Sequence, residues 1–174
     1  MKVTKYDNIL SDELYNELYD YIQILTSTKS AEFTTNITLW NKNIVKNSTP
    51  ILRYVFSEKE NTLFLKLKTE LEQKIPYKLN FVMVYLWTNL SYIPWHNDAG
   101  YSGGLTIYMN KNWEDDWGGY FIYKDADDLK IIPPKKNTAI LQENGVMHMV
   151  STINIGAEHR ITLQTFFKKE NSII

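Results

Sequence analysis

The second half of the chain is a succession of short apolar segments separated by turn residues, and this pattern constrains the fold more than any other feature. The segments are rich in aromatic and β-branched residues and cover residues 79–87, 105–109, 119–123, 129–132, 138–141, 146–150 and 160–167. Turn-forming residues separate them, namely Gly103-Gly104, Gly118-Gly119, Pro133-Pro134, Asn144-Gly145 and Gly156. Short strands at this spacing predict a mainly β fold, either a barrel or a jelly roll.

The first part of the chain has a helical pattern instead. A first helix is expected to begin after Ser11, because Asp12 and Glu13 follow this suitable N-cap and carboxylates favour the positive end of the helix dipole. A second helix is expected over residues 58–75, where apolar residues recur with helical spacing up to Pro76. Helices of this kind pack on one outer face of a barrel.

We expect a single domain over residues 1–174. Residues 1–76 are expected to give mostly helical support and a variable substrate segment, and residues 77–168 to form the barrel core. Within the first part, residues 27–57 form a polar stretch that contains Trp40 and has no firm period. That stretch stays unassigned.

The composition excludes several classes of protein. The net charge is −1 and the sequence has no basic stripe, so nucleic acid is not an expected partner. The absence of cysteine excludes thiolate metal sites and a cysteine nucleophile. The start of the chain lacks the apolar run of a signal peptide, and no stretch approaches the roughly 20 apolar residues of a membrane helix. We therefore expect a cytoplasmic location and no membrane partner, while the oligomeric state has no signature in the sequence.

The rare ionisable groups of the chain are spaced in a way that predicts a metal site. There are only three histidines, and His96 stands two residues before Asp98, so that on a strand both side chains point to the same face. A His-x-Asp pair alone is a weak signal, since a lone histidine on a strand is usually a packing residue. His148, arriving from another strand, completes a set of two histidines and one carboxylate, which is typical of non-haem Fe(II) oxygenases.

The position of Arg160 helps to choose between His148 and His159 as the third metal ligand. It also predicts a carboxylate-binding group beside the metal site. His159 adjoins Arg160, so their side chains point to opposite faces of a strand, and we expect His148 to be the ligand. An arginine offers a rigid, permanently charged fork for the carboxylate of a 2-oxo acid bound to the iron. Thr162 shares its face and adds a hydroxyl. The alternative is a surface arginine paired with Glu158, which contributes little to stability.

Taken together, these motifs resemble the signature of the 2-oxoglutarate, Fe(II)-dependent oxygenases, in particular the prolyl-4-hydroxylase-like branch. The likeness covers residues 81–167. The matching motifs, in chain order, are His96-x-Asp98, the segment Tyr108-Met109-Asn110-Lys111-Asn112-Trp113 with Gly118-Gly119, then His148, and finally Arg160-x-Thr162 with Phe166.

The resemblance implies a double-stranded β-helix that binds Fe(II), 2-oxoglutarate and O2, with ascorbate as a candidate reductant. It implies that Tyr108 joins Arg160 in holding the C5 carboxylate of 2-oxoglutarate. The implied reaction is hydroxylation of a C–H bond, foremost in a peptidyl residue such as proline, with decarboxylation of 2-oxoglutarate to succinate. Asp98 argues against a halogenase, which replaces this carboxylate by a small residue. Two alternatives stay open, namely a hydroxylase of a free amino acid or other small metabolite, and a non-catalytic module that binds 2-oxoglutarate and metal.

Four aromatic residues and one arginine are candidates for contact with the substrate. By resemblance, Tyr85 matches a pocket tyrosine near the metal. Trp95, Trp113 and Trp117 are equally consistent with an aromatic rim for a peptide and with core packing. Arg53 is a candidate clamp for a free acid, although a solvated or ion-paired role is favoured.

Overall fold

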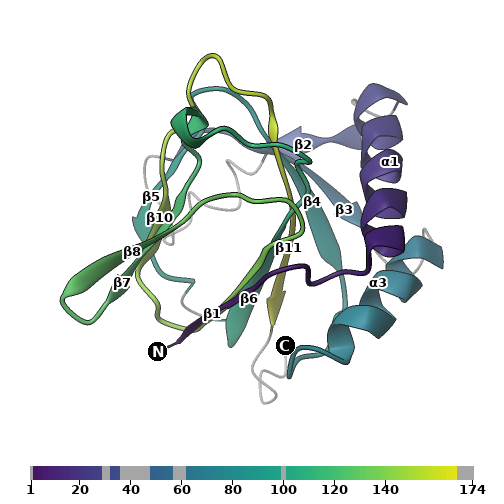
Figure 1. Ribbon diagram of the computed structural model, residues 1–174, viewed down its shortest axis with the longest axis horizontal. Coiled ribbons are helices and arrows are strands. Elements are labelled where there is room, and N and C mark those ends of the chain that lie inside the picture. The colour runs from purple at the N-terminus through teal and green to yellow at the C-terminus, as the bar shows by residue number, and fades with distance from the viewer. Residues whose placement is uncertain (1, 29–31, 36–47, 57–61, 99–100, 168–174) are drawn as a thin grey trace.

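The computed structural model describes residues 2–28, 32–35, 48–56, 62–98 and 101–167, and in it two β-sheets face each other with two helices outside the larger sheet (Figure 1). The helices include α1 (Asp12–Thr28), α3 (Thr62–Glu72) and the short 3-10 helix η2 (Asp115–Trp117). The strands are β1 (Val3–Tyr6), β2 (Thr34–Thr35), β3 (Leu52–Phe56), β4 (Val82–Trp87), β5 (Ile93–His96), β6 (Gly103–Tyr108), β7 (Phe121–Asp125), β8 (Asp128–Ile132), β9 (Ala139–Glu143), β10 (His148–Val150) and β11 (Arg160–Phe167).

From β4 onward the chain passes repeatedly between the two sheets. The larger sheet has the order β1-β9-β6-β11-β4-β3-β2 and the smaller one the order β5-β10-β7-β8. The paired strands are antiparallel throughout, including the central pairs of β11 with β4 and with β6. This crossing pattern is that of a jelly roll and confirms the predicted mainly β fold with N-terminal helices packed on one face.

The larger sheet is covered on both sides, and its central strands are therefore apolar on both faces. Val82 and Val84 of β4 belong to the core cluster that also contains the buried residues of α1 and α3. The intervening Met83, Tyr85 and Trp87 belong to a second cluster, which lies between the sheets. Since neighbouring residues of a strand point to opposite faces, β4 supports the helices with one set of side chains and lines the interior with the other.

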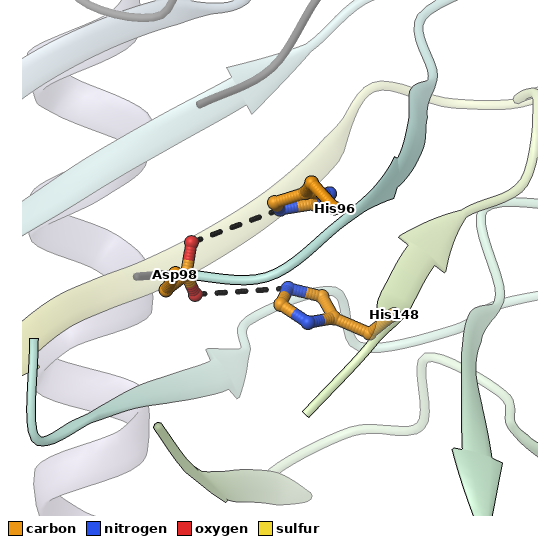
Figure 2. Close-up of side chains that lie close together, drawn as sticks. All are labelled: His96, Asp98 and His148. Atoms are coloured by element: carbon orange, nitrogen blue, oxygen red, sulfur yellow. Dashed lines mark ion pairs between the residues drawn. The ribbon is translucent and has the colours of Figure 1, made fainter. Parts of the chain in front are cut away.

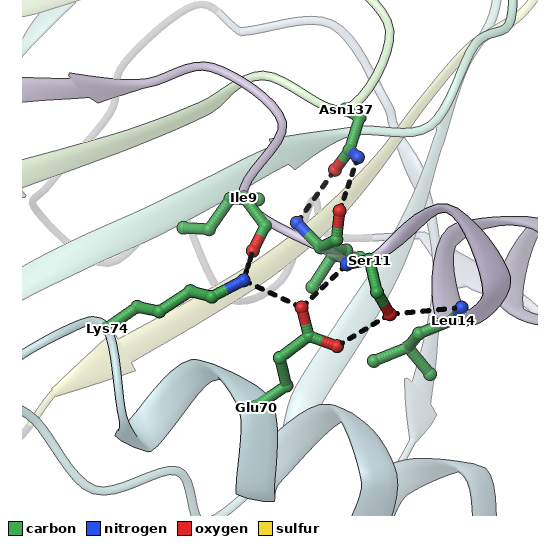
Figure 3. Close-up of polar contacts among 7 residues, drawn as sticks. Ile9, Ser11, Leu14, Glu70, Lys74 and Asn137 are labelled. Atoms are coloured by element: carbon green, nitrogen blue, oxygen red, sulfur yellow. Dashed lines mark hydrogen bonds and ion pairs between the residues drawn. The ribbon is translucent and has the colours of Figure 1, made fainter.

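Helix α1 begins as the sequence predicts. The Ser11 Oγ accepts a hydrogen bond from the Leu14 N–H at 3.4 Å, which is the N-cap interaction expected of this residue (Figure 3). The buried residues that follow recur at helical spacing and face the larger sheet; they are Leu14, Tyr15, Leu18, Ile22 and Leu25.

A polar cluster ties the start of α1 to α3 and to the turn before β9 (Figure 3). The Glu70 carboxylate of α3 accepts hydrogen bonds from the Ser11 N–H at 2.6 Å and from the Ser11 Oγ at 2.9 Å. The Lys74 ammonium donates to Glu70 and to the Ile9 carbonyl. On the other side, the Asn137 amide accepts from the Leu10 N–H at 3.0 Å and donates to the Leu10 carbonyl at 2.8 Å.

Helix α3 ends earlier than the predicted range of 58–75. It stops at Glu72, and the N–H groups of Lys74 and Ile75 both donate to the Leu71 carbonyl at 2.9 Å in a closing turn. Pro76 then has no N–H to continue the pattern. The start of the predicted range, residues 58–61, lies outside the described residues.

Four strands were not predicted, and three of them lie in the segment expected to be mostly helical support. They are β1, β2, β3 and β5. Of these, β3 extends the larger sheet next to β4, so the barrel wall begins before residue 77. Trp40, in the unassigned stretch, lies outside the described residues. In the described part of the chain, no helix has the length and apolar character needed to cross a membrane.

Candidate active site

A cavity of about 400 Å³ lies between the two sheets. Its wall includes Tyr85 and Trp87 of the larger sheet and Phe121 and Val150 of the smaller one. Most of the wall is apolar, and its polar groups are therefore few and well defined.

His96, Asp98 and His148 line this cavity, and their side chains point toward one another (Figure 2). His96 ends β5, and His148 opens β10 directly opposite it in the register of the smaller sheet. Asp98 follows in the loop after β5, with its carboxylate oxygens 3.7 Å from His96 Nε2 and 3.6 Å from His148 Nε2. One ligand atom from each residue lies within 4.8 Å of the others, and no other such group of three occurs among the described residues.

Backbone carbonyls fix both imidazoles in the tautomer that a metal ligand needs. His96 Nδ1 lies 2.8 Å from the Pro94 carbonyl oxygen, and His148 Nδ1 lies 2.8 Å from the Val146 carbonyl oxygen. A carbonyl oxygen can only accept, so each Nδ1 carries the proton and donates it. The Nε2 lone pairs are thereby left facing Asp98, an arrangement typical of metal-binding histidines.

Burial keeps these imidazoles neutral at ordinary pH. Desolvation lowers the pKa of His148 to about 4. Desolvation, together with the nearby His148, lowers the pKa of His96 to about 4 as well. Burial raises the pKa of the Asp98 carboxyl, and the nearby His96 and the hydrogen bond from Gln142 oppose this shift. Two neutral nitrogen donors and one carboxylate fit a divalent iron ion.

Gln142 of β9 is a further member of this cluster, and the sequence analysis missed it. Its Nε2 donates a hydrogen bond to the Asp98 carboxylate and lies 3.2 Å from His148 Nε2. The side chain is 4% exposed. The available signal was the alternation of β9, where Ala139 and Leu141 face the helices and Ile140 and Gln142 face the interior.

Arg160 enters the cavity from the start of β11 as a buried cation. It is 1% exposed, and its guanidinium carbon lies 4.4 Å from the centre of the Trp87 ring and 5.0 Å from that of Tyr108. Burial lowers the pKa of the Arg160 guanidinium, and the neighbouring Tyr108 opposes this shift. His159, the adjacent residue, is exposed. The alternation along the strand therefore separates the two side chains as expected.

Three polar atoms around this arginine have no hydrogen-bond partner among the described residues. They are Arg160 Nε, Arg160 Nη1 and the hydroxyl of Tyr108, which is completely buried. Burial raises the pKa of Tyr108, so its phenol remains a donor. Arg160 and Tyr108 interact with each other, and the guanidinium nitrogens and phenol oxygen that lack a well-formed hydrogen bond make a site that fits a carboxylate. These residues would hold the distal carboxylate of 2-oxoglutarate.

Gly119 provides the space that Arg160 occupies. A Cβ at this position would lie 3.1 Å from Arg160 Cδ and 3.2 Å from both Ile153 and Trp113. Its φ of +68° also lies in the region that favours glycine. The Gly-Gly motif of the sequence therefore has a structural role directly beside the cavity.

The remaining predicted site residues take different positions. The Thr162 hydroxyl accepts a hydrogen bond from Trp87 Nε1 at 3.1 Å, and it thereby holds the ring on which Arg160 stacks. Neither Thr162 nor Tyr108 forms part of the cavity wall itself. Tyr85, which the resemblance associates with the metal, does line the cavity.

The three tryptophans do not form a rim of this cavity. Trp95 is not part of the wall and is 38% exposed, with Lys124 Nζ 5.4 Å from its ring centre. The predicted pocket position of Trp95 is corrected, because His96 points inward and its neighbour on the strand must point outward. Trp113 and Trp117 pack edge to face at 5.2 Å against the cluster between the sheets, so they have the packing role.

Comparison with known proteins agrees with the class that this fold and site define. The family model of the 2OG-Fe(II) oxygenase superfamily matches residues 81–168, and the chain belongs to that superfamily. It is therefore a 2-oxoglutarate-dependent Fe(II) oxygenase by family. No curated protein matches the sequence.

Several solved structures share the fold. A prolyl-4-hydroxylase from Pseudomonas putida superposes with a TM-score of 0.80 at 13% identity, over 96% of this chain and 92% of that one. A prolyl hydroxylase from Trichoplax adhaerens, in complex with a peptide fragment of hypoxia inducible factor, superposes with a TM-score of 0.78 at 16% identity, over 97% of this chain and 84% of that one. The non-haem α-ketoglutarate-dependent epimerase SnoN from nogalamycin biosynthesis superposes with a TM-score of 0.70 at 11% identity, over 96% of this chain and 78% of that one. At these identities the likeness concerns the fold, which hosts more than one reaction.

Proposed function

We propose that the protein hydroxylates a C–H bond of a peptidyl residue, foremost proline, and converts 2-oxoglutarate and O2 to succinate and CO2 in the same reaction. The observation that carries this proposal is the presence of two complementary sites in one cavity. One is the group of His96, Asp98 and His148, and the other is Arg160, which lines the same cavity and lies 5.0 Å from the ring centre of the buried Tyr108. Iron bound with 2-oxoglutarate and O2 supplies the oxidising power for such a reaction.

The side chains of the chain would position the reactants. Arg160 would form charge-assisted hydrogen bonds to the C5 carboxylate of 2-oxoglutarate, and the Tyr108 phenol would donate another. Gln142 would keep the Asp98 carboxylate oriented toward the two imidazoles. The apolar wall would exclude water and hold the target carbon close to the metal.

One structural relative supports a peptide as the substrate. The prolyl hydroxylase from Trichoplax adhaerens was solved with a peptide fragment of hypoxia inducible factor. Its fold covers 97% of this chain, which supports a peptide as the first substrate class to test.

The test is the release of succinate from 2-oxoglutarate by the Fe(II)-loaded protein in the presence of proline-containing peptides or free amino acids. We expect peptides to stimulate release, with the gain of one oxygen atom by the peptide in mass spectrometry. His148→Ala should abolish both signals, whereas His159→Ala, which removes an exposed histidine, should not change them. Stimulation by free amino acids alone would assign the protein to small metabolites. Binding of 2-oxoglutarate without any turnover would favour a non-catalytic module.

A further inference from the structure

The cavity contains a second arginine that the proposed reaction does not use. The chain has 19 lysines and arginines, of which only Arg53 and Arg160 are arginines. Both arginines line this cavity, and none of the lysines that the structure describes does. Arginine is the residue that binds carboxylates through a planar fork of donors. The described residues offer Arg53 a cavity and no ion pair, and the solvated or ion-paired role expected from the sequence stays a prediction.

The register of the larger sheet places Arg53 apart from Arg160. Arg53 of β3 lies opposite Tyr85 of β4, which in turn lies opposite Thr162 of β11. Residues that are paired in this way share one face of a sheet, so Arg53 points to the same side as Tyr85. Two strand spacings separate the backbones of β3 and β11 by about 10 Å. The two arginines thus reach the cavity from separate parts of its wall.

The Arg53 side chain has no anionic partner in the described part of the chain. Its Nε is buried without a hydrogen-bond partner, and its Nη1 lies 4.0 Å from the sulfur of Met83, a weak acceptor. Among the described residues, Asp98 is the one carboxylate in the cavity wall, and it faces the two histidines. A partly buried guanidinium without an anion is unfavourable, and a bound carboxylate would satisfy it.

When iron and 2-oxoglutarate are bound, the positive charge of Arg53 has no counter-charge among the described groups of the cavity. A divalent iron, the Asp98 carboxylate, Arg160 and the two carboxylates of 2-oxoglutarate together have no net charge. The remaining charge is that of Arg53, which lies next to apolar side chains of the wall such as Val55 and Met83. These side chains suit the apolar body of a substrate whose anionic end reaches the arginine.

We propose that Arg53 binds a carboxylate of the substrate and selects acidic substrates. This inference rests on the proposed function and narrows its substrate class. The carboxylate has two sources with the same chemistry, namely an aspartate or glutamate next to the reacting residue of a peptide, and the α-carboxylate of a free amino acid.

The two arginines allow a direct test by NMR. Protein labelled with ¹⁵N-arginine gives one Nε–Hε signal from each arginine, and Arg53→Gln assigns them. The protein is loaded with Zn(II), which is diamagnetic, and saturated with 2-oxoglutarate. The probes are blocked proline hexapeptides with aspartate or asparagine at each position within two residues of the proline, and free L-proline against L-prolinamide.

We expect at least one acidic probe to shift the Arg53 signal and to bind about tenfold more tightly than its amide counterpart, as charge-assisted hydrogen bonds would give. Arg53→Gln should bring the two affinities within about twofold, and Arg53→Lys should keep part of the preference. The peptide and free-acid probes identify the source of the carboxylate. The affinity for 2-oxoglutarate should be unchanged in both variants.

The signal of Arg160 separates this inference from the proposed function. If 2-oxoglutarate shifts the Arg160 signal but acidic and amide probes act alike on Arg53, the inference is overturned and the proposed function stands. The same holds if no acidic probe moves the Arg53 signal. If 2-oxoglutarate leaves the Arg160 signal unchanged, the proposed function itself fails.

Discussion

At the scale of single residues, neighbouring groups hold each polar side chain of the site in one orientation. The two imidazoles are fixed by backbone carbonyls at 2.8 Å, and Asp98 is held by Gln142. The guanidinium of Arg160 is held by stacking on Trp87, whose indole N–H is bound by Thr162. A ligand would therefore meet donors and acceptors that are already in place, which lowers the entropic cost of binding.

Gln142→Leu should weaken metal binding without removing a metal ligand. The change deletes the hydrogen bond to the Asp98 carboxylate, and losses of such supporting groups reduce metal affinity by roughly 10–100-fold. Gln164→Leu is a matched control, because Gln164 lines the same cavity but accepts its hydrogen bond from Thr106. Titration of the metal-free protein with Zn(II) measures the metal affinity of both variants. Equal affinities in the two variants would show that Gln142 does not support the metal site.

At the scale of elements, a few polar contacts hold the N-terminal layer in place, and those of Asn137 are buried. Asn137 makes two hydrogen bonds to the Leu10 backbone, is 1% exposed and has a φ of +55°. Glu70 and Glu72 of α3 bind backbone N–H groups at two different sites, those of Ser11 and Leu79. The order of the N-terminal layer thus depends on side chains outside the apolar core.

Asn137→Ala should destabilise the protein by about 2–4 kcal/mol, because it leaves a buried N–H and carbonyl of Leu10 without partners and forces alanine into the left-handed region. Urea unfolding measures this change. Asn137→Gly relieves the backbone strain only and should recover a part of the loss. Asn112→Ala, at an exposed position, should change the stability by less than about 0.5 kcal/mol. A comparable loss in this control would remove the special role of Asn137.

Glu72→Gln should reduce stability at neutral pH and have no effect in acid. Burial opposes ionisation of Glu72, but hydrogen bonds from Lys68, the Leu79 N–H and Lys78 outweigh it and hold the pKa at about 2. The ordinary value is 4.5, so the carboxylate stabilises the fold above that pH and the contribution is lost as the pH falls toward 2. We expect a cost of about 1 kcal/mol at pH 7, or a Tm lower by roughly 2–4 °C.

Thermal unfolding of wild type and variant between pH 7 and pH 2 measures this dependence. The difference in Tm should shrink through the window from 4.5 to about 2. Glu17→Gln, which removes an exposed ion pair with Lys66, is the control and should have little effect at any pH. A difference for Glu72→Gln that stays constant down to pH 2 would contradict the assignment.

At the scale of the whole molecule, the sequence predicted the elements that have a clear period and the site residues that are chemically rare. The strands after residue 77 are marked by turns, and α1 by its cap and apolar stripe. β3 was missed because it is a short run inside a polar stretch, and its place in the wall follows from its pairing with β4. Gln142 was not recognised, and Arg53 was given a solvated or ion-paired role as the favoured prediction, for the same reason. Their roles depend on which residues lie opposite them on neighbouring strands, and a single sequence does not give that register.

The cavity as a whole should be stabilised by its ligands, because it contains buried charges that no residue in the described part of the chain neutralises. Zn(II) and 2-oxoglutarate, each at about 100 times its dissociation constant, should each stabilise the fold by about 2.7 kcal/mol, seen as a higher Tm. Asp98→Ala should lose the response to the metal. Arg160→Gln should lose most of the response to 2-oxoglutarate and keep that to the metal, since only the second half of the site is removed. Arg53→Gln should keep both responses, because the proposed partner of Arg53 is a carboxylate of the substrate and neither the metal nor 2-oxoglutarate. A loss of the 2-oxoglutarate response in Arg53→Gln rather than in Arg160→Gln would exchange the roles of the two arginines.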